Sequence, residues 1–406
     1  MSDLYDLPSR WKWIKLGDSY ICEKITDGTH KSPKTIDIGM PYITVKDISN
    51  KGTIDFKNCK FISNNDYETL VKSNCQPQYG DVLFSKDGTV GKVSLIDYEK
   101  KFVVLSSLAI LRPSKNISPY YLKYYLLSPY FFENAIKSKT GAAIKRVVLR
   151  TIKNLDIPVP LFDEQQRIVS KLDNLFEKID KAIELHQKNI YEVNVFMKSV
   201  LNDVFGELEE KYPKIKFDEV CNKITDGSHN PPKGIETSEF LMLSSKNVFN
   251  NSINFDSPRY LKEEDFIKEN KRTDINKGDV LLTIVGTIGR TAVVNLERKF
   301  VLQRSVAVLK PKKNLLDSYF LMYSLQKNLD ILMSGAKGAA QKGIYLKSIK
   351  NLEIVNLPLN IQQEVVKYLN EVSQKIEKIK LIQKEKMENL KALKASILDK
   401  AFKGKL

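Results

Sequence analysis

The sequence predicts an α+β protein with an internal pseudo-twofold repeat, in which two homologous mixed α/β domains are separated by a long antiparallel two-helix coiled coil. Three observations predict this architecture. The chain has 406 residues, of which 42% are hydrophobic, and this is enough for two or three domains with real cores. It contains an ordered internal repeat. Each copy of the repeat ends in a long amphipathic stretch without glycine or proline.

The repeat has a period near 198 residues. KITDGTH at 24–30 recurs as KITDGSH at 223–229, and GDVLFSKDGTVGK at 80–92 recurs as GDVLLTIVGTIGR at 278–290. Three further segments recur in the same order, so we infer that a unit of about 200 residues has been duplicated. The predicted boundaries are 1–160 and 209–358 for the globular domains, and 161–208 and 359–406 for the long helices.

Each globular domain alternates short β-branched runs with turn residues. Residues 93–96 and 102–111 of the first copy are such runs, and glycine, asparagine and aspartate separate them. The aromatic, amphipathic stretch at 119–137 predicts a helix. This mixture of elements indicates a mixed α/β domain.

The long helices are predicted at 163–205 and 360–402. Each begins with a good N-cap residue, Asp163 or Asn360, and a glutamine three positions later completes a capping box. Apolar residues then recur at spacings of three and four over several heptads, as in a coiled coil. Each helix would span about 64 Å at the usual rise per residue. Because each helix leads away from its own domain, pairing makes the two antiparallel; the alternative is that each packs only on its own domain.

Charge and composition narrow the class of function. Lys plus Arg number 65 against 49 Asp plus Glu, and the excess lies in two basic blocks separated by the acidic stretch 161–208. This pattern favours two polyanion-binding surfaces, with a generally lysine-rich proteome as the alternative. No apolar run approaches the ~20 residues that span a bilayer. The N-terminus lacks the apolar core of a secretory signal, and the four cysteines show no CxxC spacing, so we expect a cytoplasmic protein without a membrane partner.

Two recurrent motifs are candidate contacts to DNA. The TDGTH and TDGSH loops combine a turn-forming Asp-Gly with small hydroxyls and an imidazole, which can meet phosphates or base edges. The alternative is a tight turn whose histidine caps a local carbonyl. The loops GTVGK at 88–92 and GTIGR at 286–290 allow close backbone approach beside Lys92 or Arg290. They lack the Walker spacing, and a plain β-turn is the alternative.

Residues that differ between the copies at matching positions are candidates for different base preferences. The pairs are Lys31 and Asn230, Lys86 and Ile284, Asp87 and Val285, Ser106 and Arg304, and Arg146 and Gly343. Arg304 could pair with a guanine edge, and neutral surface variation is the alternative at each position. The full set of candidate DNA-binding residues is Thr26, Asp27, Gly28, Thr29, His30, Lys31, Lys86, Gly88, Gly91, Lys92, Lys145, Arg146, Thr225, Asp226, Gly227, Ser228, His229, Gly286, Gly289, Arg290, Arg304 and Lys342.

One recurrent pattern has to be tested for catalysis. A D…ExK pattern occurs at Asp81, Glu99 and Lys101, and again at Asp279, Glu297 and Lys299. Metal-dependent nucleases use two such carboxylates on Mg²⁺. Each ExK lies in a charged turn between apolar runs, however, whereas a nuclease needs these side chains fixed at the metal. We therefore predict no catalytic residue, and the cysteine and histidine spacings offer no metal site.

The sequence resembles the specificity subunit of type I restriction–modification systems over essentially its whole length. The matching segments are WKWIKLGD at 11–18, both TDG loops, both GDVL…GT.G segments, PVPLFDEQQRIV at 158–169 and LKASILDKAFKGKL at 393–406. One departure is the second junction, LPLNIQQEVV, which lacks the Glu-Gln-Gln-Arg run. Contacts of Arg167 are therefore expected to have no twin.

The resemblance implies two target-recognition domains, each reading one half of a bipartite, asymmetric site in double-stranded DNA. The helices would set the spacing and dock two modification subunits, which carry S-adenosylmethionine chemistry on adenine. Restriction subunits with motor and nuclease activity would add ATP and Mg²⁺. This chain itself would be a non-catalytic recognition subunit without its own cofactor. The alternatives are a metal-dependent DNA nuclease that uses the two D…ExK patterns, and a coiled-coil adaptor that binds no DNA.

Overall fold

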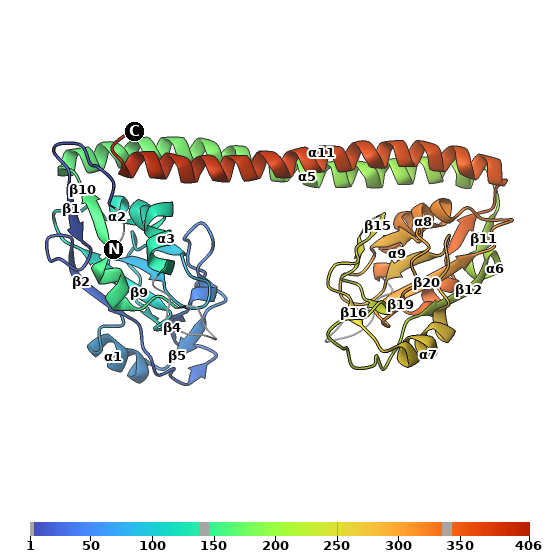
Figure 1. Cartoon of the computed structure of the whole chain (residues 1–406), viewed down its shortest axis with the longest axis horizontal. Coiled ribbons are helices and arrows are strands. Elements are labelled where there is room, and N and C mark those ends of the chain that lie inside the picture. The colour runs from blue at the N-terminus through green and yellow to red at the C-terminus, as the bar shows by residue number, and fades with distance from the viewer. Residues whose placement is uncertain (1–3, 138–145, 250, 335–342) are drawn as a thin grey trace. The chain divides into compact units, whose positions relative to one another are not determined.

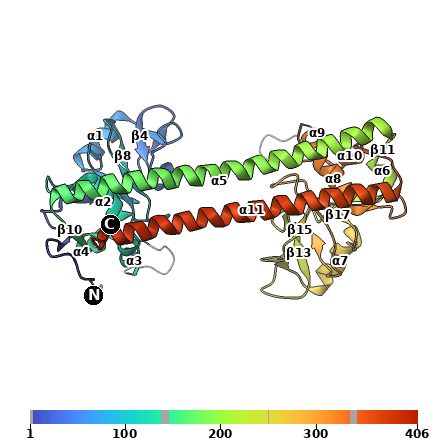
Figure 2. The same ribbon diagram turned by 90° about the horizontal axis from the view of Figure 1, so that it is seen from above.

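The computed structural model describes residues 4–137, 146–249, 251–334 and 343–406. The chain divides into two compact units: unit 1 contains the residues up to His186 together with Lys384–Leu406, and unit 2 contains Gln187–Gln383. The two long helices are α5 (Phe162–Lys211) and α11 (Leu359–Phe402). Each of them contributes one part to each unit (Figures 1 and 2).

The globular part of unit 1 is built on two sheets. The first is antiparallel in the order β2 (Cys22–Asp27), β9 (Leu108–Pro113), β6 (Val82–Ser85) and β7 (Val93–Leu95). The second has the order β3 (Thr35–Ile36), β5 (Lys60–Ile62), β4 (Met40–Ile43) and β8 (Val103–Val104), and its β4–β8 pair is parallel. Side chains alternate between the faces of a strand. Leu83 therefore enters the core shared with the second sheet, whereas Phe84 enters the core on the opposite face.

Unit 2 repeats this plan. Its first sheet is antiparallel in the order β12 (Cys221–Asp226), β20 (Val306–Pro311), β17 (Val280–Thr283) and β18 (Thr291–Val293). Its second sheet is β16 (Arg259–Tyr260), β13 (Leu241–Leu243) and β19 (Val301–Leu302), beside the hairpin of β14 (Val248–Phe249) and β15 (Ser252–Ile253). The irregularity between Cys22 and Lys24 recurs between Cys221 and Lys223. Equivalent strands in equivalent order confirm two homologous mixed α/β domains.

Short helices cover these sheets. Unit 1 has α1 (Asn64–Lys72), α2 (Pro119–Leu126), α3 (Pro129–Lys137), α4 (Leu149–Asn154) and the 3₁₀ turn η1 (Val45–Asp47). Unit 2 has α6 (Phe217–Val220), α7 (Glu263–Thr273), α8 (Ser318–Lys327), α9 (Leu329–Ser334) and α10 (Leu346–Lys350). The stretch 119–137 is helical as predicted, but the chain breaks at Leu127–Ser128 into α2 and α3. Pro129 disfavours the helical conformation at the residue before it and cannot donate a backbone hydrogen bond.

A two-stranded ribbon closes each globular domain just before its long helix. In unit 1, β1 (Lys12–Lys15) pairs antiparallel with β10 (Asp156–Val159). In unit 2, β11 (Lys214–Lys216) pairs in the same way with β21 (Glu353–Val355). The strand that enters a domain therefore pairs with the strand that leaves it, and this fixes the point at which the helix begins.

The long helices pack on each other and on the globular domain in both units. In unit 1, the core contains Leu172 and Phe176 from the first part of α5 and Leu398 and Phe402 from the last part of α11. The Phe402 ring lies 5.2 Å from that of Tyr121, centroid to centroid. The predicted antiparallel pairing is confirmed, and the alternative of packing only on the helix's own domain is wrong for α11, whose end completes unit 1.

Unit 2 contains the complementary parts of the same helices. Val200 and Phe205 from the later part of α5 share a core with Val366 and Leu369 from the early part of α11. The helix α5 ends later than predicted, because it continues through Gly206 to Lys211. No described helix has the length and apolar character needed to cross a membrane.

A buried glutamine anchors the start of each long helix. The Gln165 side chain accepts a hydrogen bond from the Ser118 amide at 2.9 Å and donates to the carbonyls of Asn116 (3.0 Å) and Pro160 (3.3 Å). Gln362 accepts from the Asp317 amide at 2.8 Å and donates to the carbonyls of Leu315 and Leu357, both at 2.8 Å. The predicted capping partners were the next residues, Gln166 and Gln363, which are exposed. Gln165 thus joins the start of α5 to the loop before α2, and Gln362 joins the start of α11 to the loop before α8.

Arg167 makes contacts that the second copy does not repeat. Its guanidinium pairs with Glu164 at 2.7 Å and donates to the carbonyl of Leu406 at 3.0 Å, linking α5 to the end of the described chain. The corresponding position in the second copy is Glu364.

Candidate nucleic-acid interface

The TDG loops are tight turns at the ends of β2 and β12. A Cβ atom on Gly28 would lie 1.9 Å from the Val104 carbonyl oxygen, and one on Gly227 would lie 2.1 Å from that of Leu302. No other residue fits at such a distance. The next amide donates to the same carbonyl in each unit, from Thr29 at 3.0 Å and from Ser228 at 2.7 Å. These amides hold the turn against the neighbouring loop, so they are not available to phosphate.

The aspartate of each turn pairs with the histidine three residues later. Asp27 Oδ2 lies 3.3 Å from His30 Nε2, and Asp226 Oδ2 lies 2.8 Å from His229 Nε2. The two histidine side chains are 76% and 54% exposed. Each aspartate therefore orients an imidazole that stands at the surface, with Nδ1 directed away from the carboxylate. The predicted alternative, in which the histidine caps a carbonyl, is not what the geometry gives.

Each aspartate also has a cationic partner, and the two units supply it from different elements. In unit 1, Lys86 at the end of β6 places its Nζ 3.1 Å from Asp27 Oδ2, and the residue is 7% exposed. In unit 2 the same position is the buried Ile284. There Arg272, in the last turn of α7, donates to Asp226 Oδ1 at 2.5 Å and to the Asp226 carbonyl at 2.9 Å. Lys86 and Ile284 thus differ because each unit supplies the cation that pairs with its aspartate from a different element.

The two glycine loops are hairpin turns. Gly88 and Gly91 have φ of 68° and 102°, and Gly286 and Gly289 have φ of 82° and 91°, a region that L side chains rarely adopt. A Cβ on Gly91 would lie 2.6 Å from the Phe132 ring. The Gly91 amide donates to the Ser85 carbonyl at 3.0 Å. The geometry favours the β-turn alternative over a phosphate-binding loop.

Lys92 and Arg290, which follow these turns, bind backbone within their own unit. Lys92 Nζ donates to the carbonyl of Val45 at 3.2 Å and also to that of Ile48. Arg290 Nη1 donates to the Val248 carbonyl at 3.5 Å, and its guanidinium lies 5.0 Å from the centre of the Phe249 ring. Lys92 thus holds the η1 turn that follows β4, and Arg290 holds the hairpin strand β14. Their contact with DNA phosphate remains a prediction.

Five segments meet at one edge of each unit. In unit 1, the Ser106 amide donates to Thr29 at 2.9 Å, the Lys86 amide to Ser107 at 2.9 Å and the Val147 amide to Lys86 at 2.8 Å. We call this the loop edge, comprising residues 27–31, 44–46, 86–88, 104–107 and 146–147 of unit 1. In unit 2 it comprises 226–230, 244–246, 284–287, 302–305 and 343–344, which are joined by equivalent backbone bonds, including Arg304 to Ser228 at 2.9 Å.

The loop edges differ in the side chains that they expose. Unit 1 presents His30, Lys31, Lys46 and Arg146, and unit 2 presents His229, Asn230, Lys246 and Arg304. Thr26 and Thr225 are partly buried beside them. Lys46 and Lys246 were missed by the sequence reasoning, although VKD and SKN occupy matching places in the two copies and the repeat could have revealed them. Lys145 and Lys342 lie outside the described residues.

The D…ExK patterns do not assemble. Asp81 is fully buried and receives two hydrogen bonds of 2.9 Å from Arg112, which raise the pKa of the guanidinium. Asp279 is bound by Lys310 at 2.6 Å. The glutamates and lysines of both patterns are exposed in their turns, and the described residues contain no group of three potential metal ligands. Burial raises the pKa of Cys22 and of Cys221 to about 12, so neither is a nucleophile at neutral pH.

Comparison with known proteins identifies the family to which the chain is similar. The type I restriction modification DNA specificity domain matches residues 8–194 and 210–387. The type I restriction enzyme MjaVIII specificity subunit of Methanocaldococcus jannaschii is 24% identical, covering 98% of this chain and 94% of that protein. The EcoKI specificity subunit of Escherichia coli K12 is 23% identical, covering 97% and 89%.

A solved structure shares the fold. A chain from a structural study of complex assembly and conformational transition of the type I restriction–modification system superposes with a TM-score of 0.68 at 22% identity, covering 99% of this chain and 100% of that one. The family match falls on both copies of the repeat and on both loop edges. This protein therefore belongs to the family of type I restriction–modification DNA specificity subunits, which are non-catalytic.

Proposed function

We propose that each unit reads one half of a bipartite, asymmetric DNA site through its loop edge. One observation carries the proposal: the two loop edges share a backbone framework but present different exposed side chains. Ser106 stands where unit 2 has Arg304, and both donate the same backbone hydrogen bond to the TDG turn. A common scaffold with divergent tips supports two half-sites of different sequence, because positioning contacts and base contacts are separable in DNA recognition.

Within this proposal the exposed side chains divide into two groups. His30 and His229 occupy equivalent places and would make equivalent contacts to phosphate or base edges. Arg304 has no described partner for its guanidinium and would contribute guanine recognition to the half-site of unit 2 alone. Arg146 corresponds to Gly343 in the alignment of the two copies, and it would contribute guanine recognition to the half-site of unit 1 alone.

The proposal extends to partners. The paired helices would set the distance between half-sites and dock two modification subunits, which bring S-adenosylmethionine and methylate adenine. Restriction subunits would bring ATP and Mg²⁺, and the whole assembly would act on DNA in the cytoplasm. This chain would contribute recognition and geometry but no cofactor. Tyr191, Val195 and Phe196 on α5 are apolar and exposed. Such a surface supports the proposal that the helices contact another protein.

Domain exchange tests the assignment of one half-site to each unit. Replacing residues 1–160 by the same segment of another family member is expected to change one half of the methylated motif and to leave the other half unchanged. Sequencing of methylated positions in cells that carry the complete system measures this. The reciprocal exchange of 209–358 is the matched control, and it should change only the other half. A chimaera that alters both halves at once contradicts the assignment.

Helix length tests the spacing. Adding four residues to each helix, near positions 186 and 383, lengthens the pair by about 6 Å. The gap between half-sites is expected to grow by one or two base pairs, because B-DNA rises about 3.4 Å per base pair. Four residues nearly complete one helical turn, whereas two residues move the apolar seam to the wrong face and should abolish activity. A four-residue variant that methylates sites with the original gap rules out the spacing function.

A further inference from the structure

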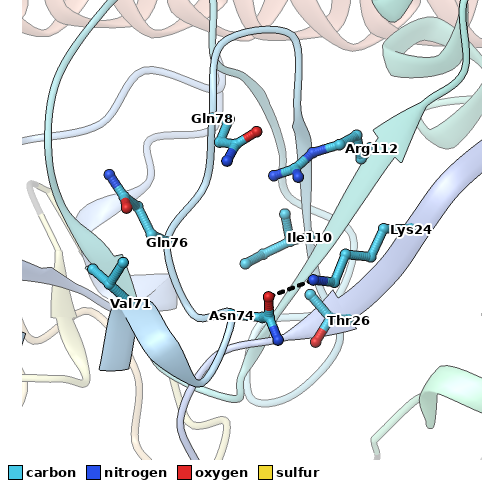
Figure 3. Close-up of a pocket in the computed structure, with 8 residues that line it drawn as sticks. All are labelled: Lys24, Thr26, Val71, Asn74, Gln76, Gln78, Ile110 and Arg112. Atoms are coloured by element: carbon cyan, nitrogen blue, oxygen red, sulfur yellow. Dashed lines mark hydrogen bonds between the residues drawn. The ribbon is translucent and has the colours of Figure 1, made fainter. Parts of the chain in front are cut away.

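Unit 1 contains a polar pocket on the face of β2 and β9 that is directed toward the second sheet. Its volume is about 70 Å³, and Figure 3 shows its lining side chains converging from the two strands and from the loop after α1. Lys24 pairs with Arg112, and Thr26 with Ile110, in the register of the two strands, so these four side chains share one face of the sheet. Asn74 and Gln78 approach from the loop opposite.

The pocket offers more hydrogen-bond donors than its own groups use. The Lys24 ammonium donates to the Asn74 side chain and keeps two further N–H groups. Arg112 uses Nε and Nη2 on Asp81 and keeps Nη1. The side-chain amide of Gln78 has no hydrogen-bond partner among the described residues, whereas its backbone amide donates to Asp81 Oδ2 at 2.7 Å. Because the buried Asp81 neutralises Arg112, Lys24 supplies the net positive charge.

Size and charge together select the ligand. A water needs roughly 10–15 Å³ of such space, so the pocket holds about five to seven water-sized groups, which is enough for the five heavy atoms of a phosphate. A nucleobase is larger than that. Surplus N–H donors and one net positive charge suit a tetrahedral oxyanion better than a cation or an apolar group.

At the equivalent strand face of unit 2, the cations bind groups of the chain itself. Lys223, the counterpart of Lys24, donates to the Arg272 carbonyl at 2.6 Å. Lys310, the counterpart of Arg112, donates to the carbonyl of Asp274 at 2.5 Å and to Asp279 at 2.6 Å. The Arg272 side chain then runs along β12 to Asp226, so the chain's own groups take the place that is open in unit 1.

We propose that this pocket binds one phosphate of the DNA backbone, as a contact that the half-site of unit 1 has and that of unit 2 lacks. The proposal rests on the proposed function. Its place in the fold supports it, because Thr26 directly precedes Asp27 of the TDG turn and thus lies beside the loop edge. The contact would position DNA without reading its sequence.

The test uses the full chain and double-stranded DNA that carries the methylated motif. Affinity is measured by fluorescence anisotropy between 50 and 200 mM salt, on specific DNA and on DNA of unrelated sequence. Lys24→Gln is expected to reduce the log–log salt slope by about one on both DNAs, because one phosphate contact is lost. Lys24→Arg should keep the parental slope. Lys223→Gln is the matched control in unit 2 and should leave the slope unchanged.

Three outcomes overturn the proposal. They are a parental slope for Lys24→Gln, an equal reduction for Lys223→Gln, and stabilisation of the parent by inorganic phosphate without any effect of Lys24→Gln on the DNA slope, which assigns the pocket to a free anion. Thermal unfolding checks that Lys24→Gln remains folded. A parent chain that shows no salt-dependent DNA binding contradicts the proposed function itself, and the two failures are therefore distinguishable.

Discussion

Replacing Lys86 by methionine is expected to lower the free energy of unfolding of unit 1 by about 3 kcal/mol and to abolish binding to its half-site. The side chains of Lys86 and Asp27 are only 9% and 14% exposed, and removal of one partner from such a largely buried ion pair leaves a poorly compensated charge. The TDG turn that carries His30 would lose its internal support. Urea unfolding of the full chain, with DNA binding measured in parallel, determines both effects.

Two controls test this explanation. One removes the carboxylate that has lost its partner, and the other supplies the lost cation from a different position. Asp27→Asn in the Lys86→Met background removes the orphan carboxylate and should recover most of the stability. In unit 2, Arg272→Met removes the corresponding cation, and a smaller loss is expected because the Arg272 side chain is 45% exposed. Ile284→Lys should repair this loss, because that backbone position is held by the same hydrogen bonds as Lys86. If Ile284→Lys alone stabilises the parent as much as it stabilises Arg272→Met, the two cations are not interchangeable partners of the aspartate.

Replacing Gln165 by leucine is expected to cost about 3–4 kcal/mol and to detach the start of α5 from unit 1. The substitution leaves one buried amide and two carbonyls without their side-chain partner, and each unsatisfied group costs about 1–3 kcal/mol. Gln362→Leu should have an equal effect on unit 2. Chemical denaturation measures both losses.

The neighbouring residue is the control for this prediction. Gln166 carries the same side chain one position later but is exposed, so Gln166→Leu should change stability by less than about 0.5 kcal/mol. Gln165→Glu keeps an acceptor for the Ser118 amide but buries a carboxylate against the carbonyls of Asn116 and Pro160, so a loss at least as large as that of Gln165→Leu is expected. Equal effects at 165 and 166 would show that the buried network contributes nothing specific.

Local patterns were sufficient to predict the architecture. The repeat, the β-branched runs between turn residues and the long stretches of helical periodicity depend on nearby residues, and each appears in the structure close to where the sequence places it. The break between α2 and α3 was missed because the amphipathic pattern continues across Ser128, although Pro129 was there to signal it.

The partners of individual side chains were beyond local patterns. A lysine that follows a strand, such as Lys86, is usually exposed, and its burial depends on Asp27 arriving from a distant strand. Lys92 looks like a phosphate ligand beside glycines until the carbonyls of Val45 and Ile48 are brought to it. Gln165 and Gln166 are the same residue type at adjacent positions, so the sequence does not show which of them is buried. The hydrogen bonds from the loop before α2 identify Gln165 as the buried one.

The discontinuous composition of unit 1 has a consequence for biosynthesis. Unit 2 is one continuous stretch, Gln187–Gln383, and has all of its core residues once that stretch has left the ribosome. Synthesis of unit 1 begins first, but its core is complete only after Leu398, Ala401 and Phe402 have been synthesised. The Phe402 carbonyl also accepts a hydrogen bond from Tyr5 at 2.9 Å. The usual vectorial order, in which the N-terminal domain matures first, is thereby reversed. A nascent chain whose synthesis stops early would carry a finished unit 2 beside an unfinished unit 1, exposing apolar surface to chaperones and proteases.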